Sequence, residues 1–143
     1  MAKIILTHEG QLRIKTQGHT YEDKYLVSDA PKVMGGLGDN PSPTDLLAIA
    51  WGSCIFTMIA NQAKKMNISL EGARLEVDKT LEKSPPYPLS SISADIFCPE
   101  PEEDSVKEAL RQAANSCPIH HSLHPSVEQN LNFEWVSSSL SSH

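Results

Sequence analysis

Residues 35–66 read GGLGDNPSPTDLLAIAWGSCIFTMIANQAKKM, a glycine-rich loop that runs into a long apolar segment. Ser42 is a typical helix N-cap, and Pro43 fits the first helical position because its missing N–H is not needed there. Asp45 stands three residues after Ser42 and can reach back to the Ser42 N–H, as in a capping box. The sequence therefore predicts a helix that begins at Pro43 and stops near Asn67.

Apolar side chains fall on almost every side of this helix between Leu46 and Ala60. A helix that is apolar all round is expected to be buried nearly all round. A chain of 143 residues is long enough for one domain, residues 1–143, with a core of its own. Its own sheet is too small to cover such a helix, so we expect an obligate oligomer.

The composition bounds the partners and the compartment. A net charge of −6 without a basic cluster argues against a nucleic-acid partner. The first ten residues lack the apolar core of a signal peptide, and the longest apolar stretch falls short of the roughly 20 residues that a membrane span needs. Three cysteines without a secretory signal indicate a reducing cytoplasm, where a disulfide is more often catalytic or transient than structural.

The remaining apolar patterns predict short strands and a second helix on either side of the central helix. The expected strands cover residues 4–6, 12–14, 19–28, 75–78, 92–98 and 131–135, and the second helix covers residues 101–116. Short connections favour antiparallel neighbours, so the fold class is expected to be α+β.

Two of the three cysteines are candidate reactive thiols. Cys54 lies in the middle of the predicted helix, beside the small residues Gly52 and Ser53, and Cys117 opens the segment CPIHHSL. A lone cysteine is usually a small core residue. We interpret Cys98 in this way, because it shares one face of a predicted strand with apolar residues.

The segments PSPTDLL at residues 41–47, Gly-Ser-Cys at 52–54 and CPIH at 117–120 together closely resemble the OsmC/Ohr family, over roughly residues 27–136. The resemblance implies a curved antiparallel sheet wrapped on a long central helix, in an intertwined homodimer. It also implies a cysteine-based peroxide reductase of the oxidative or osmotic stress response, with no cofactor and no metal. In that scheme Cys54 attacks an organic hydroperoxide, Cys117 resolves the sulfenic acid to a disulfide, and a thiol reductant restores both thiols.

The sequence departs from the peroxidase branches of that family at the groups that activate the thiol. Thr44 occupies the position of their glutamate, and the carboxylate comes one residue later, at Asp45. Asp45 is therefore the third candidate catalytic residue. Residues 25–40 contain no arginine, which leaves Lys32 and the upstream Arg13, a residue typical of a solvated strand position, as candidate cations. The substrate pocket is expected at the subunit interface, lined by Trp51, Phe56 and Met58.

Two alternatives remain open from the sequence. Cys117, His120, His121 and His124 are four possible metal ligands within eight residues, although zinc motifs usually pair two such clusters. The other alternative is a non-catalytic OsmC-like dimer that binds a ligand and whose cysteines are only packing groups.

Overall fold

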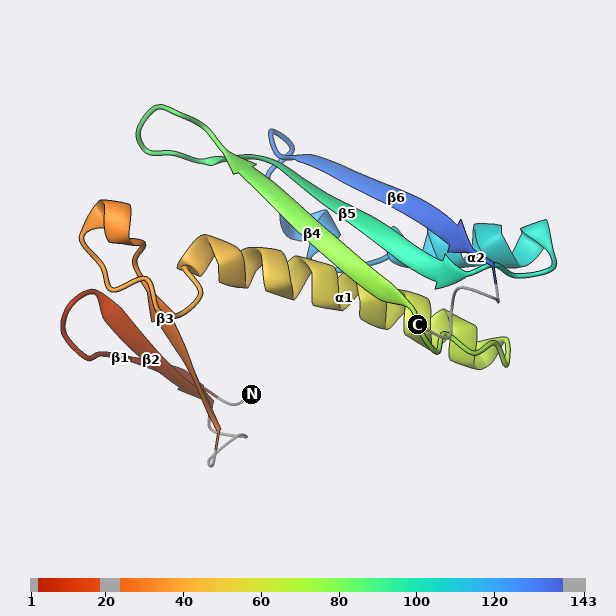
Figure 1. The fold of residues 1–143 in the computed structure, drawn as a ribbon, viewed down its shortest axis with the longest axis horizontal. Helices are drawn as coiled ribbons and strands as arrows, with labels where there is room; N and C mark the ends of the chain where they lie inside the picture. The colour runs from red at the N-terminus through yellow and green to blue at the C-terminus, as the bar shows by residue number, and fades with distance from the viewer. Residues whose placement is uncertain (1–2, 19–23, 138–143) are drawn as a thin grey trace. The chain divides into compact units, whose positions relative to one another are not determined.

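The computed structural model describes residues 3–18 and 24–137, and Figure 1 shows how they fold. Three strands come first, then a long helix, two strands, a second helix and a last strand, which is the order that the sequence predicts. The fold class is therefore α+β, as expected. The chain divides between Leu47 and Ala48 into two compact units, and the single domain expected over residues 1–143 stays a prediction.

The first unit carries an antiparallel sheet in the order β1-β2-β3. The strands are β1 (Ile4–His8), β2 (Arg13–Gly18) and β3 (Tyr25–Asp29). The first two form the predicted hairpin, with its ladder running from the Ile4–Gly18 pair to the His8–Ile14 pair. The third strand was expected over residues 19–28, and of these residues 19–23 lie outside the described residues.

The glycine-rich loop after β3 has a steric reason for its composition. It begins with a short 3₁₀ helix, η1 (Lys32–Met34), which ends at Gly35 in the left-handed conformation with a φ of 88°. A Cβ at Gly36 would overlap the backbone carbonyl of Ala30. Side chains at these two positions would strain or displace the loop that leads to the central helix.

Helix α1 (Pro43–Lys65) begins and ends close to where the sequence predicts. Ser42 Oγ accepts the N–H of Asp45 at 3.1 Å, and Asp45 Oδ2 accepts the N–H of Ser42 at 3.0 Å, which is the expected capping box. At the other end Asn67 adopts a φ of 56°, and the Ile68 N–H donates to the Ala63 carbonyl at 2.9 Å. Asn67 therefore ends the helix as predicted.

Within the single chain α1 buries one face, so burial nearly all round, which was expected with the cover of a second subunit, stays a prediction. The buried residues recur every three or four positions and so share a face: Ala48, Trp51, Gly52, Ile55, Ile59 and Ala63. On other sides of the helix, Leu47 and Ile49 keep 36% and 52% of their surface exposed. The elements of one chain thus leave part of the apolar surface of α1 uncovered.

The length of α1 differs from one expectation about membrane spans. The helix is long and apolar enough, by length and composition alone, to cross a bilayer, contrary to the expectation that no segment would be. The core helix of a soluble protein meets the same criterion, and one face of α1 packs in a core. Length and composition therefore give only weak evidence for a membrane partner.

The sheet of the second unit has the order β4-β5-β6, with β4 (Arg74–Leu81), β5 (Leu89–Pro99) and β6 (Glu128–Val136). Strands β4 and β5 are antiparallel, but β5 and β6 run parallel, which differs from the antiparallel arrangement expected. The connection between them contains helix α2 (Asp104–Ala114). Such a crossover returns the chain to the same end of the sheet, so the next strand pairs in parallel.

The core of the second unit forms between this sheet and the two helices, and Figure 1 shows α1 running along the sheet. Alternate residues of β5 are buried, as the sequence predicts: Ile92, Ala94, Ile96 and Cys98. Gly52 brings α1 close to β4, because a Cβ there would lie only 2.7 Å from Val77 Cγ2. This close approach holds the middle of α1 on the sheet.

Candidate active site

Cys54 and Cys117 lie next to each other, although 63 residues separate them in the sequence. Cys54 sits in the middle of α1, Cys117 follows the end of α2, and the two thiol groups are near enough to interact with each other. Cys54 is partly exposed, whereas Cys117 is completely buried, and both are free thiols. Neighbouring sulfurs are the first requirement for a disulfide between them.

A turn of backbone surrounds the Cys117 sulfur. The chain continues from Cys117 into a 3₁₀ helix, η2 (His120–Ser122), and the His120 N–H donates to Cys117 Sγ at 3.3 Å. Burial raises the pKa of the Cys117 thiol, as does the hydrogen bond with Cys54, and together they outweigh the backbone N–H groups of His120 and Ile119, which lower it. Cys117 therefore keeps its proton at neutral pH.

Gln129 of β6 connects this turn to α1. The indole Nε1–H of Trp51 donates to Gln129 Oε1 at 2.8 Å, and Gln129 Nε2 donates to the His120 carbonyl oxygen at 2.9 Å. Sequence reasoning missed Gln129, because a single glutamine in a strand forms no motif and Trp51 is 78 residues away. The one available signal was the alternation of β6, which places Gln129 on the same face as Leu131 and Phe133.

Asp45 lies in the first turn of α1, two and a half turns before Cys54. Its carboxylate accepts the Ser42 N–H and so caps the helix. The hydroxyl of Thr44 lies 3.2 Å from Ser42 Oγ. Thr44 occupies the position at which the peroxidase branches of the OsmC/Ohr family have a glutamate. Both residues thus contribute to the start of the helix, and a catalytic role for Asp45 stays a prediction.

Arg13 is an ion-pair residue rather than the solvated strand residue that the sequence suggested. Its Nε and Nη2 donate to the Asp29 carboxylate at 2.7 Å and 2.9 Å, and Nη2 also lies 3.2 Å from Asp39 Oδ2. The Asp29 side chain is fully buried, and the hydrogen bond from Arg13 holds the pKa of that carboxyl well below its usual range. Two carboxylates of the first unit therefore already balance the Arg13 charge.

The pocket expected around Trp51, Phe56 and Met58 is only partly present in the single chain. Trp51 is completely buried, and Met58 packs against the same core, so both act as core residues. Phe56 does line a shallow hollow on α1, together with Ser53, Thr57 and Ala60. This hollow includes Ser53, the neighbour of Cys54 in the sequence, and lies on the side of α1 that the chain leaves uncovered.

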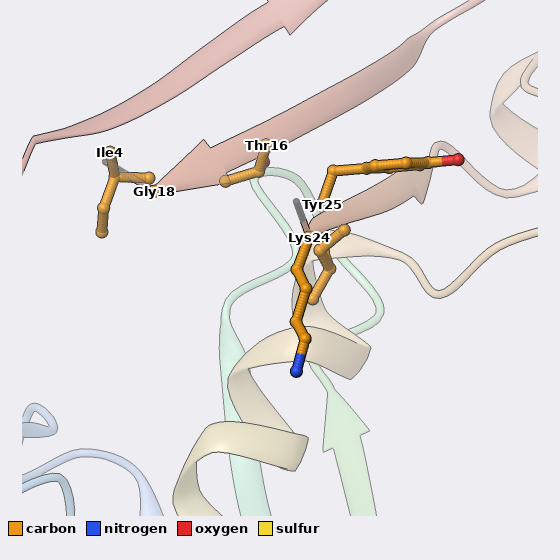
Figure 2. A pocket seen from close by; sticks show the side chains of 6 residues that line it. Ile4, Thr16, Gly18, Lys24 and Tyr25 are labelled. Carbon is orange, nitrogen blue, oxygen red and sulfur yellow. The ribbon is translucent and has the colours of Figure 1, made fainter. Parts of the chain in front are cut away.

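A second hollow, of about 310 Å³, lies on the sheet of the first unit and is shown in Figure 2. Its lining is largely apolar and comes from all three strands and from the residue before β3: Ile4, Thr16, Gly18, Lys24, Tyr25 and Leu26. None of the three cysteines is among these lining residues.

The histidines after Cys117 do not gather around a common point. His121 Nε2 lies 2.7 Å from the Asn115 carbonyl oxygen, whereas His124 Nδ1 lies 2.8 Å from Ser126 Oγ. Within residues 3–18 and 24–137, no three His, Cys, Asp or Glu side chains form a group that could hold a metal ion. The structure thus gives the metal-site alternative no support among these residues.

The third cysteine, Cys98, is a core residue of β5 with no exposed surface. Burial raises the pKa of its thiol to about 11. A protonated thiol without access to solvent is a poor nucleophile, so Cys98 is chemically the quietest of the three.

Comparison with known proteins gives one family and a set of similar structures. The family model described as OsmC-like protein matches residues 36–132, which include both cysteine motifs. No curated protein matches the sequence.

The similar structures extend over nearly the whole chain. A Psychrobacter arcticus protein, named for an osmotic stress induced and detoxification response, is 29% identical with a TM-score of 0.85 and covers 94% of this chain and 96% of its own. The Legionella pneumophila organic hydroperoxide resistance protein OsmC is 18% identical with a TM-score of 0.73 over 94% and 96% of the two chains. An organic hydroperoxide resistance protein from Elizabethkingia anophelis is 14% identical with a TM-score of 0.72 over 95% and 98%.

Proposed function

The chain belongs to the OsmC-like protein family, and on this basis we propose that it is a thiol-dependent peroxidase that reduces organic hydroperoxides. Structures of the same fold that are named for organic hydroperoxide resistance support this substrate class and a role in stress response. The observation that carries the proposal is the close approach of the Cys54 and Cys117 thiols, which brings the two motifs together.

The surroundings of the two thiols suit different roles. Cys54 is partly exposed, so a peroxide can approach its sulfur. Cys117 is completely buried and its pKa is raised, so it stays protonated and can donate its S–H toward Cys54. We therefore assign the peroxidatic role to Cys54 and the resolving role to Cys117.

The two thiols together provide the two electrons that a peroxide accepts. The Cys54 thiolate attacks one oxygen of ROOH, the O–O bond breaks, an S–O bond forms, and the alkoxide takes a proton to leave as ROH. The Cys117 sulfur then displaces water from the sulfenic acid, which forms the Cys54–Cys117 disulfide. An external thiol reductant returns both sulfurs to thiols, as expected in a reducing cytoplasm, and no cofactor enters either step.

The test counts thiols before and after addition of one equivalent of cumene hydroperoxide. The wild type should lose two thiols and form one disulfide, and Cys54→Ser should lose none. Cys117→Ser should lose one thiol, stop after a single turnover and carry a sulfenic acid that dimedone traps. Cys98→Ala, which changes a buried thiol outside the pair, is the matched control and should behave as the wild type.

Rates decide between a peroxidase and a non-catalytic binding dimer. Stopped-flow mixing should show that the wild type reacts much faster than free cysteine at the same pH, and faster with bulky alkyl peroxides than with hydrogen peroxide. Asp29 and Asp39 already balance the Arg13 charge, which makes Arg13 a poor activating cation for the thiol. A wild-type rate no higher than that of free cysteine would leave the ligand-binding dimer as the better description.

A further inference from the structure

The side chain of Gln129 is half-buried and is hydrogen-bonded at both ends. Its Oε1 accepts the indole N–H of Trp51 on α1, and its Nε2 donates to the His120 carbonyl in the turn after Cys117. An indole nitrogen can only donate and a carbonyl can only accept, so the two partners fix which end of the amide is which. A glutamine at this position satisfies both partners at once.

These bonds complete a ring of contacts that contains both thiols. From Gln129 the ring passes to His120, whose N–H donates to Cys117 Sγ at 3.3 Å, and then to the neighbouring thiol of Cys54. Cys54 is three residues after Trp51 on α1, so one turn of helix closes the ring. Each member is therefore joined to the next by a hydrogen bond, by the helix or, for the two thiols, by their proximity.

Core packing alone does not explain this choice of residue. An apolar side chain of similar size would fill the space, whereas the half-buried Gln129 amide is favourable only while its groups are paired. Without Gln129, the Trp51 N–H and the His120 carbonyl would each lose a partner. The turn that carries Cys117 would then lose this link to α1.

We infer that Gln129 is a positioning residue that fixes the Cys117 sulfur against Cys54 and so sets the rate of disulfide formation. The inference rests on the proposed function in one respect, that these two thiols form a disulfide. The affected step is the condensation in which Cys117–SH and the Cys54 sulfenic acid give the disulfide and water. The attack of Cys54 on the peroxide makes no bond to Cys117, so its rate should change much less than the rate of disulfide formation.

Two substitutions separate positioning from packing. Gln129→Met keeps the volume and removes both hydrogen bonds, whereas Gln129→Glu keeps an acceptor for Trp51 and loses the donor to the His120 carbonyl. Both variants should form sulfenic acid at close to the wild-type rate and form the disulfide about tenfold more slowly, because orientation of the two groups is lost. Asn130→Ala, the next residue of β6 with an exposed side chain, is the matched control and should change neither rate.

A measurement without peroxide keeps this inference distinct from the proposed function. The equilibrium between the two thiols and the disulfide in glutathione buffer should shift toward the thiols in both Gln129 variants, by about tenfold. A wild type that forms this disulfide in glutathione but ignores peroxide would overturn the peroxidase proposal and leave the positioning role standing. Equal constants and equal disulfide rates in wild type and variants would overturn the positioning role, as would an equal fall in both steps.

Discussion

Arg13 and Asp29 face each other across the β2–β3 ladder and form a two-point ion pair, with Nε–Oδ1 and Nη2–Oδ2 distances of 2.7 Å and 2.9 Å. The buried carboxylate also accepts the backbone N–H groups of Asp39 and Asn40 at 3.1 Å and 3.0 Å. Asp29 thus ties the sheet of the first unit to the loop that leads into α1.

Substitution of Asp29 should destabilise the protein, and the loss should disappear in acid. The pKa of Asp29 is lowered in the folded state, so its carboxylate stabilises the fold fully above the pKa of an unfolded aspartate, about 3.9. That contribution is lost as the pH falls through the lower pKa of the folded state. Asp29→Asn should therefore lower the urea midpoint at pH 7 and lower it less at pH 3.

The exposed carboxylate of Glu134, on β6, provides the control for Asp29. Glu134→Gln should change the free energy of unfolding by no more than about 0.5 kcal/mol at either pH. An equal, small effect of both substitutions at pH 7 would show that the ion pair contributes nothing measurable.

The contrast between Asp45 and Asp29 shows what the sequence could predict. The capping box of Asp45 joins residues that are three positions apart. Helical periodicity and strand alternation are equally local patterns, so the helices and strands could be predicted from the sequence. The partner of Asp29 is 16 residues away and depends on strand register. The Cys54–Cys117 pair was expected only from a family resemblance, and Gln129, which bonds across 78 residues, left no local signal.

The capping box gives a prediction that separates two roles for Asp45. Asp45→Ala removes the acceptor for the Ser42 N–H and should lower the free energy of unfolding by about 1 kcal/mol. Asp45→Asn keeps an oxygen acceptor and should lower the free energy of unfolding less. It removes the negative charge, however, that would hold a cation in place beside the thiol. Stopped-flow rates with cumene hydroperoxide should then fall in Asp45→Asn. A wild-type rate in this variant would limit Asp45 to capping.

Gly52 should be intolerant of even one methyl group. A Cβ at this position would meet Val77 Cγ2 at 2.7 Å and Leu75 Cδ2 at 3.2 Å, so Gly52→Ala must push α1 away from β4. We expect a loss of about 1–3 kcal/mol in the free energy of unfolding, measured by urea denaturation. Ser53→Ala, at the exposed neighbouring position, should stay within about 0.5 kcal/mol of wild type. Alanine has a better helix propensity than glycine, so the added methyl group could instead raise the stability. That result would show that the side chains of β4 move aside at little energetic cost.

The uncovered side of α1 leads to a prediction about assembly. Ile49 is 52% exposed within one chain, and an apolar surface of this kind on a long helix is typical of a subunit interface. We expect a homodimer at micromolar concentration by sedimentation equilibrium, and Ile49→Asp should dissociate it. Asn61→Asp, which adds the same charge at an exposed polar position of α1, should remain dimeric. A stable, folded wild-type monomer under these conditions would refute the homodimer.

Peptide mapping of peroxide-treated protein should find one disulfide, between Cys54 and Cys117, and a free Cys98. The first two thiols already lie next to each other, whereas Cys98 is fully buried and its pKa is raised to about 11. An alkylating reagent added at pH 7 before peroxide should therefore modify Cys54 first and leave Cys98 untouched until the protein unfolds. Oxidation that appears at Cys98 while Cys117 remains a thiol would mean that the assigned pair is wrong, whatever the rate of peroxide consumption.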